Sequence, residues 1–524
     1  MGDSGRCSDL RPPLARSVTR IVIGLAVVFS AAACSDPIDD ESVGQILPIP
    51  TAENDVDPTS PDGSDPQAAE DGEAVADPTT MAGQEALWAQ RRDAVVARLQ
   101  AGEFGSNDDG FLIGPGDFNV DLTRCPRGWT DDPDGDTIVI GHVLSVADYG
   151  PFADGASAYF DHVNATGGIG GRRIDYRLVD DELTPTKTIE AVDDWLDGDT
   201  PLAITTFGTP TTQAVFDQLN GRCIPQPFVG SAHPAWGDPR RHPWTTGLPV
   251  SYATEIIQWG SWIKRNLAGE LPVVAGALVI DNDYGRVHQE ALERWTTRNR
   301  DVIDELVVVS HDPSSPNVGA ELNEIAEANP DVFMAVTAGP ACGSVLTDGE
   351  SAGLNESTSA RFTATACADV DRFFQPAGRS GEGYLSIDGG VKNIDDPAGN
   401  DDPFVMFIRE LLDGAGIDDD SGLAAVGAGQ FAWAYVEALR IAAELNGGVT
   451  RSNLLLALRS LDLRHPMLLE GISFATEGAD DAYPIEGSRM LRYSAGLAAW
   501  EPESLVVDLN RRTPTCSWDG QECG

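Results

Sequence analysis

The sequence predicts an α/β protein whose two lobes are each built on a doubly wound parallel sheet. Short apolar strands alternate with helical segments from about residue 137 onward. This alternation is typical of parallel sheets that carry helices on both faces. It occurs in two successive runs, of which the first begins at Thr137 and the second at Val273. The two runs share no sequence repeat, but they indicate two lobes of similar architecture.

The first run contains four predicted strands. Its opening strand, Thr137–Leu144, is apolar over most of its length, and the helix Pro151–Asn164 after it ends in a glycine turn at residues 166–171. A second helix begins near Thr211, and a long helix runs from Tyr252 to about Leu267. The other strands predicted here are Arg173–Asp180, Leu202–Phe207 and Ile224–Val229.

The second run repeats the pattern, beginning with the apolar strand Val273–Ile280. Two further helices, Leu423–Leu445 and Arg451–Leu461, follow this run, and we expect them to return to the first lobe. The tail from Arg489 is loosely β-like. The other elements predicted in the run are the strands Glu305–Val309, Asp331–Thr337 and Arg361–Ala366, the helices Tyr284–Asn299 and Gly319–Ala328, and a helix after Cys342.

Composition and motifs narrow the classes of function. The chain carries 83 acidic and 35 basic residues, and its formal net charge of -48 repels nucleic-acid phosphates and anionic membrane surfaces. The sequence contains no G-x-S-x-G elbow, no H-E-x-x-H motif and no Walker loop. Its seven histidines show no metal-ligand spacing. We therefore expect neither an enzyme nor a nucleic-acid-binding protein, and no cofactor or metal.

The N-terminus is typical of an export signal. Four arginines precede the apolar stretch Ile21–Phe29, which is shorter than the about 20 residues that a membrane-spanning helix needs. The small residues Ala31–Ala33 and then Cys34 follow, and this run resembles the lipobox of bacterial lipoproteins. The resemblance implies that Cys34 becomes the lipid-modified first residue of the mature chain. Plain signal-peptide cleavage is the alternative, because Ala31 stands where the lipobox usually has Leu or Val.

Six cysteines remain when Cys7 and Cys34 are set aside. An even number of cysteines in an exported chain indicates disulfides, although six cysteines allow several pairings. We pair them by expected proximity: one pair closes a short tail loop, one follows or ends neighbouring strands of the second lobe, and the remaining pair lies near the amino ends of first-lobe strands. The predicted pairs are, in that order, Cys516–Cys523, Cys342–Cys367 and Cys125–Cys223.

Polar loops follow the predicted strands, and ligands of open parallel sheets bind beyond the carboxyl ends of the strands. In the loop after the third strand, Thr209 is a suitable N-cap and Pro210 suits the first helical position. The free N–H groups there, with the threonine hydroxyls, would suit a carboxylate. The candidate ligand-binding residues of the first run are Ser145, Tyr149, Thr209, Thr211, Ser231 and His233.

The second run contributes Tyr284, in the loop DNDYG at residues 281–285, and Asp369, which follows a later strand. Each candidate also has a purely structural interpretation. The threonines would then be helix caps, His233 would brace a loop, and Tyr149 and Tyr284 would be ordinary loop aromatics. The candidates gain weight together, because all of them lie at strand ends of the two predicted lobes.

From about Thr137 to Leu461 the chain resembles the type I periplasmic binding proteins, in the branch of the branched-chain amino acid receptors. The strongest piece is residues 162–174, HVNATGGIGGRRI, which matches the pattern NAxGGIxGRxI of that family. The loop DNDYG at residues 281–285 and the segment GEGY at residues 381–384 are the other matching pieces. The resemblance implies two lobes joined by a hinge of three crossovers, with a small solute bound in the cleft between them.

The resemblance also implies roles for individual residues. In the amino-acid receptors of the family, first-lobe loops hold the ligand carboxylate, and those positions fall on Thr209, Ser231 and His233. An aromatic residue after the first strand corresponds to Tyr149, and the second-lobe tyrosine corresponds to Tyr284. The acidic residue that holds the ligand ammonium has its nearest match in Asp369.

We therefore expect a lipid-anchored solute-binding protein on the outer face of the cell membrane, which delivers an amino acid or a related small polar solute to an ABC-type permease. A ligand-sensing receptor subunit of the same fold is the alternative. The predicted parts are a signal peptide at 1–33, a disordered acidic linker at 34–83, a helical extension at 84–124, lobe 1 at 125–250 and 385–465, lobe 2 at 251–384 and 466–505, and a tail at 506–524.

Overall fold

The structure is a computed structural model that describes residues 19–20, 77–127, 135–418, 422–514 and 516. Cys34 and Cys523 lie outside the described residues, as do most of the predicted signal peptide and linker. Among the helices that the structure describes, none combines the length and the apolar character needed to cross a membrane.

The predicted first run forms a parallel sheet in the order β6-β5-β7. These three strands are β5 (Thr137–Leu144), β6 (Arg173–Asp180) and β7 (Ala203–Thr206). A parallel bridge between Phe207 and Gly230 continues the sheet to β8 (Gln226–Val229), which pairs with β9 (Thr245–Gly247). The predictions of β5 and β6 match the structure at both ends.

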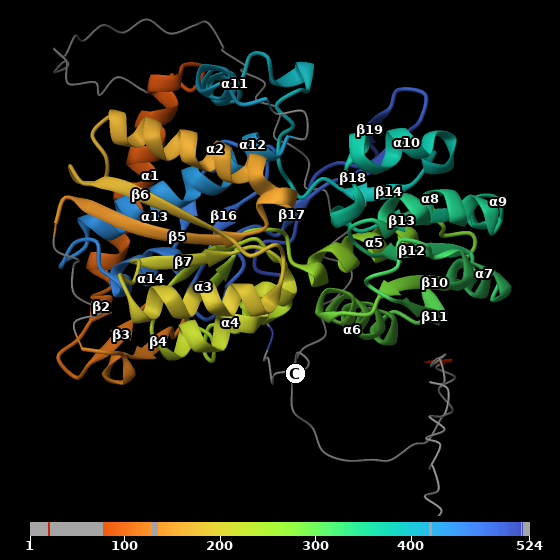
Figure 1. Ribbon diagram of the computed structural model, residues 1–524, viewed down its shortest axis with the longest axis horizontal. Coiled ribbons are helices and arrows are strands. Elements are labelled where there is room, and N and C mark those ends of the chain that lie inside the picture. Colours follow the sequence, from red (N-terminus) through yellow and green to blue (C-terminus); the bar gives the residue numbers. More distant parts are fainter. Residues whose placement is uncertain (1–18, 21–76, 128–134, 419–421, 515, 517–524) are drawn as a thin grey trace, which may run out of the picture. The chain divides into compact units, whose positions relative to one another are not determined.

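Helices cover both faces of this sheet (Figure 1). Alternate residues of β5 point to opposite sides, so Ile138 and Ile140 pack in the cluster that contains α2 (Val146–Ala165), whereas Val143 packs with α3 (Pro185–Asp197) and α4 (Thr209–Gly221). The helices that return to this lobe are α12 (Leu423–Ala425), the π-helical η8 (Val426–Ala432), α13 (Trp433–Glu444) and α14 (Arg451–Leu458).

The second run forms a larger sheet, which in the described residues has eight strands in the order β1-β11-β10-β12-β13-β14-β18-β19. The strands from β10 to β14 run parallel, and β1, β18 and β19 pair antiparallel at the two edges. The bounds are β1 (Thr19–Arg20), β10 (Val273–Ile280), β11 (Ile303–His311), β12 (Val332–Val336), β13 (Ala360–Thr363), β14 (Leu385–Ile387), β18 (Met490–Ser494) and β19 (Ala499–Pro502).

Four long helices cover the larger sheet. One face packs against α5 (Tyr252–Asn266) and α6 (Asp283–Arg298), and the other packs against α7 (Gly319–Glu327) and α8 (Ala341–Ser351). The shorter elements that follow are α9 (Leu354–Ser357), η4 (Thr365–Cys367), the π-helical η5 (Val370–Phe374), α10 (Gln375–Ala377) and η6 (Gly378–Gly381).

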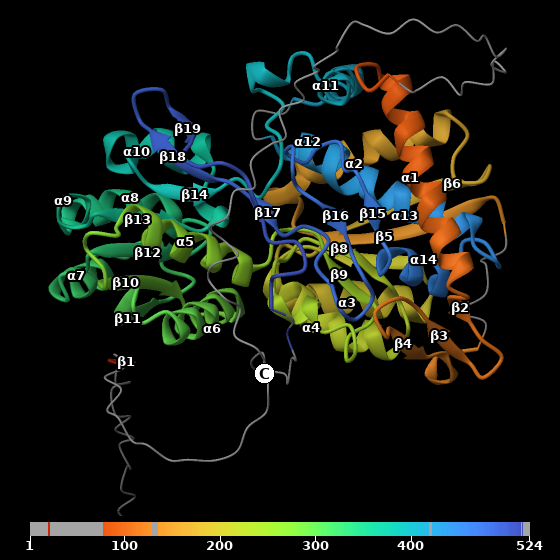
Figure 2. The same cartoon turned by 180° about the vertical axis from the view of Figure 1, so that it is seen from behind.

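The N-terminal extension is longer than the sequence predicted. Helix α1 (Met81–Ala101) begins three residues before Gln84, because the Thr80 side chain accepts a hydrogen bond from the Gly83 N–H and caps the helix. Helix α1 runs beside α13 (Figure 2). A small antiparallel sheet follows, and its strands β2 (Gly105–Ser106), β3 (Phe111–Ile113) and β4 (Asn119–Asp121) were not predicted.

Two other boundaries differ from the prediction. β14 belongs to the larger sheet, although residues 385–465 were assigned to lobe 1, because its backbone pairs with β13 and β18. Phe474, in the segment assigned to lobe 2, packs against Trp433 of α13. The remaining elements are η2 (Leu122–Arg124), η3 (Pro234–Gly237), η7 (Pro397–Gly399), α11 (Pro403–Ala415), β15 (Asp462–Leu463), β16 (Phe474–Ala475), β17 (Gly487–Ser488) and β20 (Val507–Asp508).

Two predicted disulfides are present. Cys125 pairs with Cys223 at a Cα–Cα distance of 5.6 Å, and Cys342 pairs with Cys367 at 5.2 Å. The third predicted pair, Cys516–Cys523, stays a prediction because Cys523 is outside the described residues.

Candidate functional site

The start of α4 is set by a glycine. Gly208 is the N-cap of α4 and has a φ of 97°, a conformation that side-chain-bearing residues rarely adopt. The prediction that Thr209 is the N-cap was therefore wrong by one residue, because only glycine adopts this backbone conformation readily. Thr209 and Pro210 are the first two helical residues. The N–H groups of this first turn have no partner within the helix.

Three buried hydroxyls meet at the start of α4. The Thr209 hydroxyl lies 2.9 Å from the Ser231 hydroxyl and 2.9 Å from the Tyr252 hydroxyl. Ser231 comes from the loop after β8, and Tyr252 is the first residue of α5. Thr209, Ser231 and Tyr252 are called the hydroxyl cluster below. A hydroxyl both donates and accepts, so this cluster can exchange hydrogen bonds with a polar group of a solute.

Tyr252 connects the hydroxyl cluster to α6. Its ring packs over His288 at a centroid distance of 3.9 Å and meets the ring of Tyr284 edge-on at 5.2 Å. Burial raises the pKa of Tyr252 to about 12, which keeps its hydroxyl neutral. Helix α4 also contacts α6 directly, so the loops of the smaller sheet and the start of α6 form one site.

Tyr284, the predicted second-lobe tyrosine, supplies the free polar group of the site. Its side chain is 9% exposed, and its hydroxyl has no hydrogen-bond partner among the described residues. Burial, followed by the neighbouring Tyr252, Glu255 and Tyr149, raises its pKa well above 10. A buried donor without a partner costs about 1–3 kcal/mol, which a ligand that accepts its hydrogen bond would restore.

Tyr149 lies at a kink in α2. Its backbone is non-helical (φ -130°, ψ 17°), and Pro151, two residues later, cannot donate to the helix. The kink stacks the Tyr149 ring on Phe207 with centroids 4.0 Å apart. Phe207 in turn lies over Gly230, where a Cβ atom would come within 2.4 Å of its ring. Burial and then Asp148 raise the pKa of Tyr149, so its hydroxyl also stays neutral.

His233 was expected to hold a ligand carboxylate, but the structure places it as the brace of a loop. Its Nδ1 accepts a hydrogen bond from the Ala235 N–H (2.9 Å) and caps η3. Its Nε2 faces the Gln213 side-chain amide at 2.7 Å. Burial lowers the pKa of His233 to about 3, so the ring is neutral at physiological pH and offers no positive charge to an anion.

Thr211 and Ser145 also use their hydroxyl groups locally. The Thr211 hydroxyl donates to the carbonyls of Phe207 and Gly208 (2.5 and 3.0 Å). The Ser145 hydroxyl donates to Asp148 (2.8 Å). These bonds hold the loops in place, because each of them closes a short stretch of the same segment.

Asp369, predicted to hold a ligand ammonium, caps η5 by accepting a hydrogen bond from the Arg372 N–H (2.9 Å). The Arg372 guanidinium lies 3.6 Å from the Asp148 carboxylate, which follows β5 in the smaller sheet. This pair therefore joins the two sheets beside the site. Both side chains are more than a third exposed, so the ion pair contributes little to the stability of the fold.

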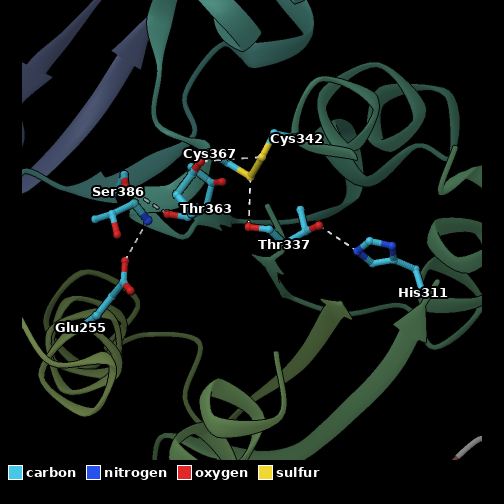
Figure 3. Close-up of a disulfide and its surroundings, with 9 residues drawn as sticks. Glu255, His311, Thr337, Cys342, Thr363, Cys367 and Ser386 are labelled. Carbon is cyan, nitrogen blue, oxygen red and sulfur yellow. Dashed lines mark hydrogen bonds between the residues drawn. A yellow bond between two sulfur atoms is a disulfide. The ribbon is translucent and has the colours of Figure 1, made fainter. Parts of the chain in front are cut away.

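Sequence reasoning missed Tyr252, Glu255 and His288. Glu255 is 1% exposed; its Oε1 accepts the Thr365 N–H (3.1 Å), and its Oε2 lies 3.3 Å from His288 Nε2. Figure 3 shows Glu255 reaching the segment that also carries Cys367 and its disulfide with Cys342. The available signal was a carboxylate on the apolar face of α5, one turn after an aromatic residue at the helix start.

The candidate site is rich in hydroxyl groups. Among the residues that the structure describes, no group of three or more His, Cys, Asp or Glu side chains is arranged to hold a metal ion. A separate groove of about 1020 Å³ is lined by α1 and residues 461–475, with Lys392, Asp402 and Arg511. Its lining includes none of the predicted ligand-binding residues, so the chemistry described above does not coincide with that groove.

Comparisons with solved structures show where this fold occurs elsewhere. The chain is similar to a branched chain amino acid ABC transporter from Thermus thermophilus with bound valine (16% identity, TM-score 0.62, covering 72% of this chain and 97% of that chain). It is similar to a fatty acid ABC transporter substrate-binding protein from Thermomonospora curvata (16%, 0.62, 78% and 99%). It is also similar to a solute binding protein of an ABC transporter from Rhodopseudomonas palustris BisB5 in complex with 3,4-dihydroxy benzoic acid (17%, 0.58, 72% and 98%).

At these identities, structural similarity shows the fold alone. A comparison with curated proteins gave no match. The model of the family described as "Periplasmic binding protein" matches residues 145–494, which is more than half of the chain. The mixed α/β architecture with parallel sheets agrees with the two-lobe type I fold of the similar structures. The chain therefore belongs to the periplasmic binding protein family.

Proposed function

We propose that this protein is a lipid-anchored, extracytoplasmic solute-binding protein that captures a small solute with a carboxylate or an isosteric polar group and delivers it to an ABC-type permease. The Tyr284 hydroxyl carries the proposal, because it is buried and lacks a partner among the described residues beside the hydroxyl cluster. A hydrogen bond from this hydroxyl to a carboxylate would be charge-assisted and therefore stronger than one to a neutral group.

One carboxylate oxygen accepts the hydrogen bond from Tyr284, and the other oxygen meets the start of α4. The first-turn N–H groups and the helix dipole favour a negative group there. Thr209 and Ser231 add hydroxyls at the same place, and all three side chains of the hydroxyl cluster are buried, which excludes competing water. The net charge of -48 opposes anions at long range, but salt screens that repulsion beyond about 8–10 Å, so the local donors decide the affinity.

The ammonium of an amino-acid solute would need an acidic partner. Asp369 retains one carboxylate oxygen beyond its cap to the Arg372 N–H, and it is half-buried. Glu255 already bonds to Thr365 and lies against His288. The ammonium of an amino-acid solute would therefore approach Asp369.

Delivery to a permease is supported by the similar structures, whose names identify them as ABC transporter components. The lipid anchor is supported by the sequence Ala31–Cys34 alone, which lies outside the described residues.

The experiment is a thermal-shift screen of the purified mature chain against amino acids, aromatic acids and aliphatic acids, followed by calorimetry. A ligand at 100 times its Kd should add about 2.7 kcal/mol to the free energy of unfolding. For the best ligand, Tyr284→Phe should weaken binding about tenfold or more, while leaving the ligand-free protein as stable as before or slightly more stable, because an unpaired buried hydroxyl is removed.

Tyr384→Phe is the matched control. Tyr384 is also buried in the larger sheet's lobe and its hydroxyl also lacks a partner among the described residues, but it packs against Phe374 away from the hydroxyl cluster. Tyr384→Phe should leave the affinity unchanged. Equal affinities for wild type, Tyr284→Phe and Tyr384→Phe would remove Tyr284 from the site and contradict the proposal.

A further inference from the structure

Two large apolar side chains are exposed at the carboxyl ends of β5 and β6, next to the site. Val146, directly after the loop residue Ser145, is 42% exposed, and Leu183, three residues after β6, is 40% exposed. Single exposed apolar residues are common on protein surfaces. Val146 and Leu183 differ from such single exposed residues because of the backbone conformation of the loop after β6.

The loop after β6 is strained. Glu182 and Leu183 are consecutive non-glycine residues with positive φ angles of 50° and 54°. Neighbouring carboxylates enforce this conformation. Asp180 Oδ1 accepts the Val146 N–H (3.1 Å) and the Glu182 N–H (3.0 Å), and Asp181 Oδ1 accepts the Leu183 N–H (2.9 Å). Strain that the surroundings hold in place in this way is concentrated at functional sites.

The strained loop aims Leu183 at the start of α4. A Cβ atom built on Gly208 would lie 2.9 Å from Leu183 Cδ1, so the leucine lies against the N-cap that precedes Thr209. Phe207 is the residue before Gly208, and Tyr149 is stacked on it. We call Val146, Leu183, Phe207 and Tyr149 the apolar strip: Leu183 lies against the N-cap of α4, Tyr149 is stacked on Phe207, and the Val146 N–H bonds to Asp180 at the base of the Leu183 loop.

The strip fits a hydrocarbon chain better than it fits a second polar group. A carboxylate at Thr209 would place the first atoms attached to it beside Phe207 and the later atoms of a longer chain toward Leu183. Burial of a chain there would cover the apolar surface that the strained loop leaves exposed.

We infer that the solute is an aliphatic monocarboxylic acid whose chain passes Phe207 and lies over Leu183 and Val146. This inference rests on the proposed function, which supplies the carboxylate end. It predicts that affinity depends on chain length, because each methylene that reaches the apolar strip is removed from water.

The test is calorimetry of the mature protein with the series butanoate, hexanoate and octanoate, each below its aggregation concentration. Each added methylene should raise the affinity about fourfold, the factor that corresponds to burial of one methylene group. Leu183→Asn removes the apolar side chain, and asparagine adopts the left-handed conformation more readily than most residues do, so the loop should keep its shape. This variant should bind butanoate within about twofold of wild type and gain less than twofold per methylene.

Leu505→Asn is the control, because Leu505 is 80% exposed and follows β19, outside the apolar strip. It should retain the wild-type series. A flat wild-type series, with measurable binding of butanoate or of an amino acid, would overturn this inference and leave the carboxylate site standing. The same series in Leu183→Asn as in wild type would overturn it as well. Failure of every carboxylate to bind wild type would overturn both proposals.

Discussion

Replacement of Gly208 by alanine tests whether the glycine N-cap builds the site. Alanine at a φ of 97° is disfavoured by about 1–2 kcal/mol relative to glycine. The new Cβ would also lie 2.9 Å from Leu183 Cδ1 and 2.9 Å from Thr211 Oγ1. The leucine end can rotate away, but displacement of the Thr211 hydroxyl weakens its bonds to the Phe207 and Gly208 carbonyls at a cost of about 1 kcal/mol. Gly208→Ala should therefore destabilise the protein by about 2–3 kcal/mol.

Urea unfolding followed by tryptophan fluorescence measures this difference, and Gly221→Ala is the matched control. Gly221 ends the same helix, and a Cβ built there meets no atom within 4 Å. Because alanine has the higher helix propensity, Gly221→Ala should be neutral or stabilising by up to about 1 kcal/mol. A Gly208→Ala variant as stable as wild type would refute the reasoning that α4 needs a glycine at its start.

Three further perturbations test other parts of the account. Asp481 is 4% exposed, and burial followed by the charge of Glu486 raises its pKa to about 7. The folded state then binds the Asp481 proton more tightly than the unfolded state does, so stability declines as the pH rises from about 4 to about 7. Asp481→Asn should remove that decline, so that between pH 4 and pH 8 the variant should lose up to about 4 kcal/mol less folding free energy than wild type. Melting temperatures measured from pH 4 to pH 8 follow this difference, and an unchanged slope would contradict the assignment. Removal of the Cys125–Cys223 disulfide, which closes a separation of 98 residues, should lower the free energy of unfolding by about 2–4 kcal/mol, whereas an unaltered urea midpoint would show that the bond is dispensable. Cys34→Ala should release the protein from membranes in a fractionation experiment, and normal membrane retention would exclude the lipid anchor.

The central strands were predictable because their signal is local. β5 and β10 are largely apolar, β6 alternates charged and apolar residues over part of its length, and the predicted ends of all three eight-residue strands match the structure. β14 has three residues and is defined by pairing with β13 and β18, which come from distant parts of the chain. Such short strands leave no periodic signal in the sequence, so the hinge boundary near residue 384 was misplaced.

The strand-end position of the candidate loops was predictable, but the hydrogen-bond partners of their side chains were not. The loops after β5, β7 and β8 were identified from the rule that ligands lie beyond the carboxyl ends of parallel strands. Sequence alone does not show where a polar side chain finds its partner. The Thr211 hydroxyl bonds to the backbone one turn earlier, and the His233 ring caps η3, so neither offers a free group to a carboxylate. Tyr252 was missed because its contact with Thr209 joins residues that lie 43 positions apart in the sequence.

A crystal structure of the protein with its tightest-binding carboxylate tests the central claim most directly. The account predicts one carboxylate oxygen within hydrogen-bond distance of the Tyr284 hydroxyl, with the same group contacting Thr209 or the first-turn N–H groups of α4. A ligand bound in the groove lined by α1 and residues 461–475, with the Tyr284 hydroxyl still lacking a partner, would contradict it.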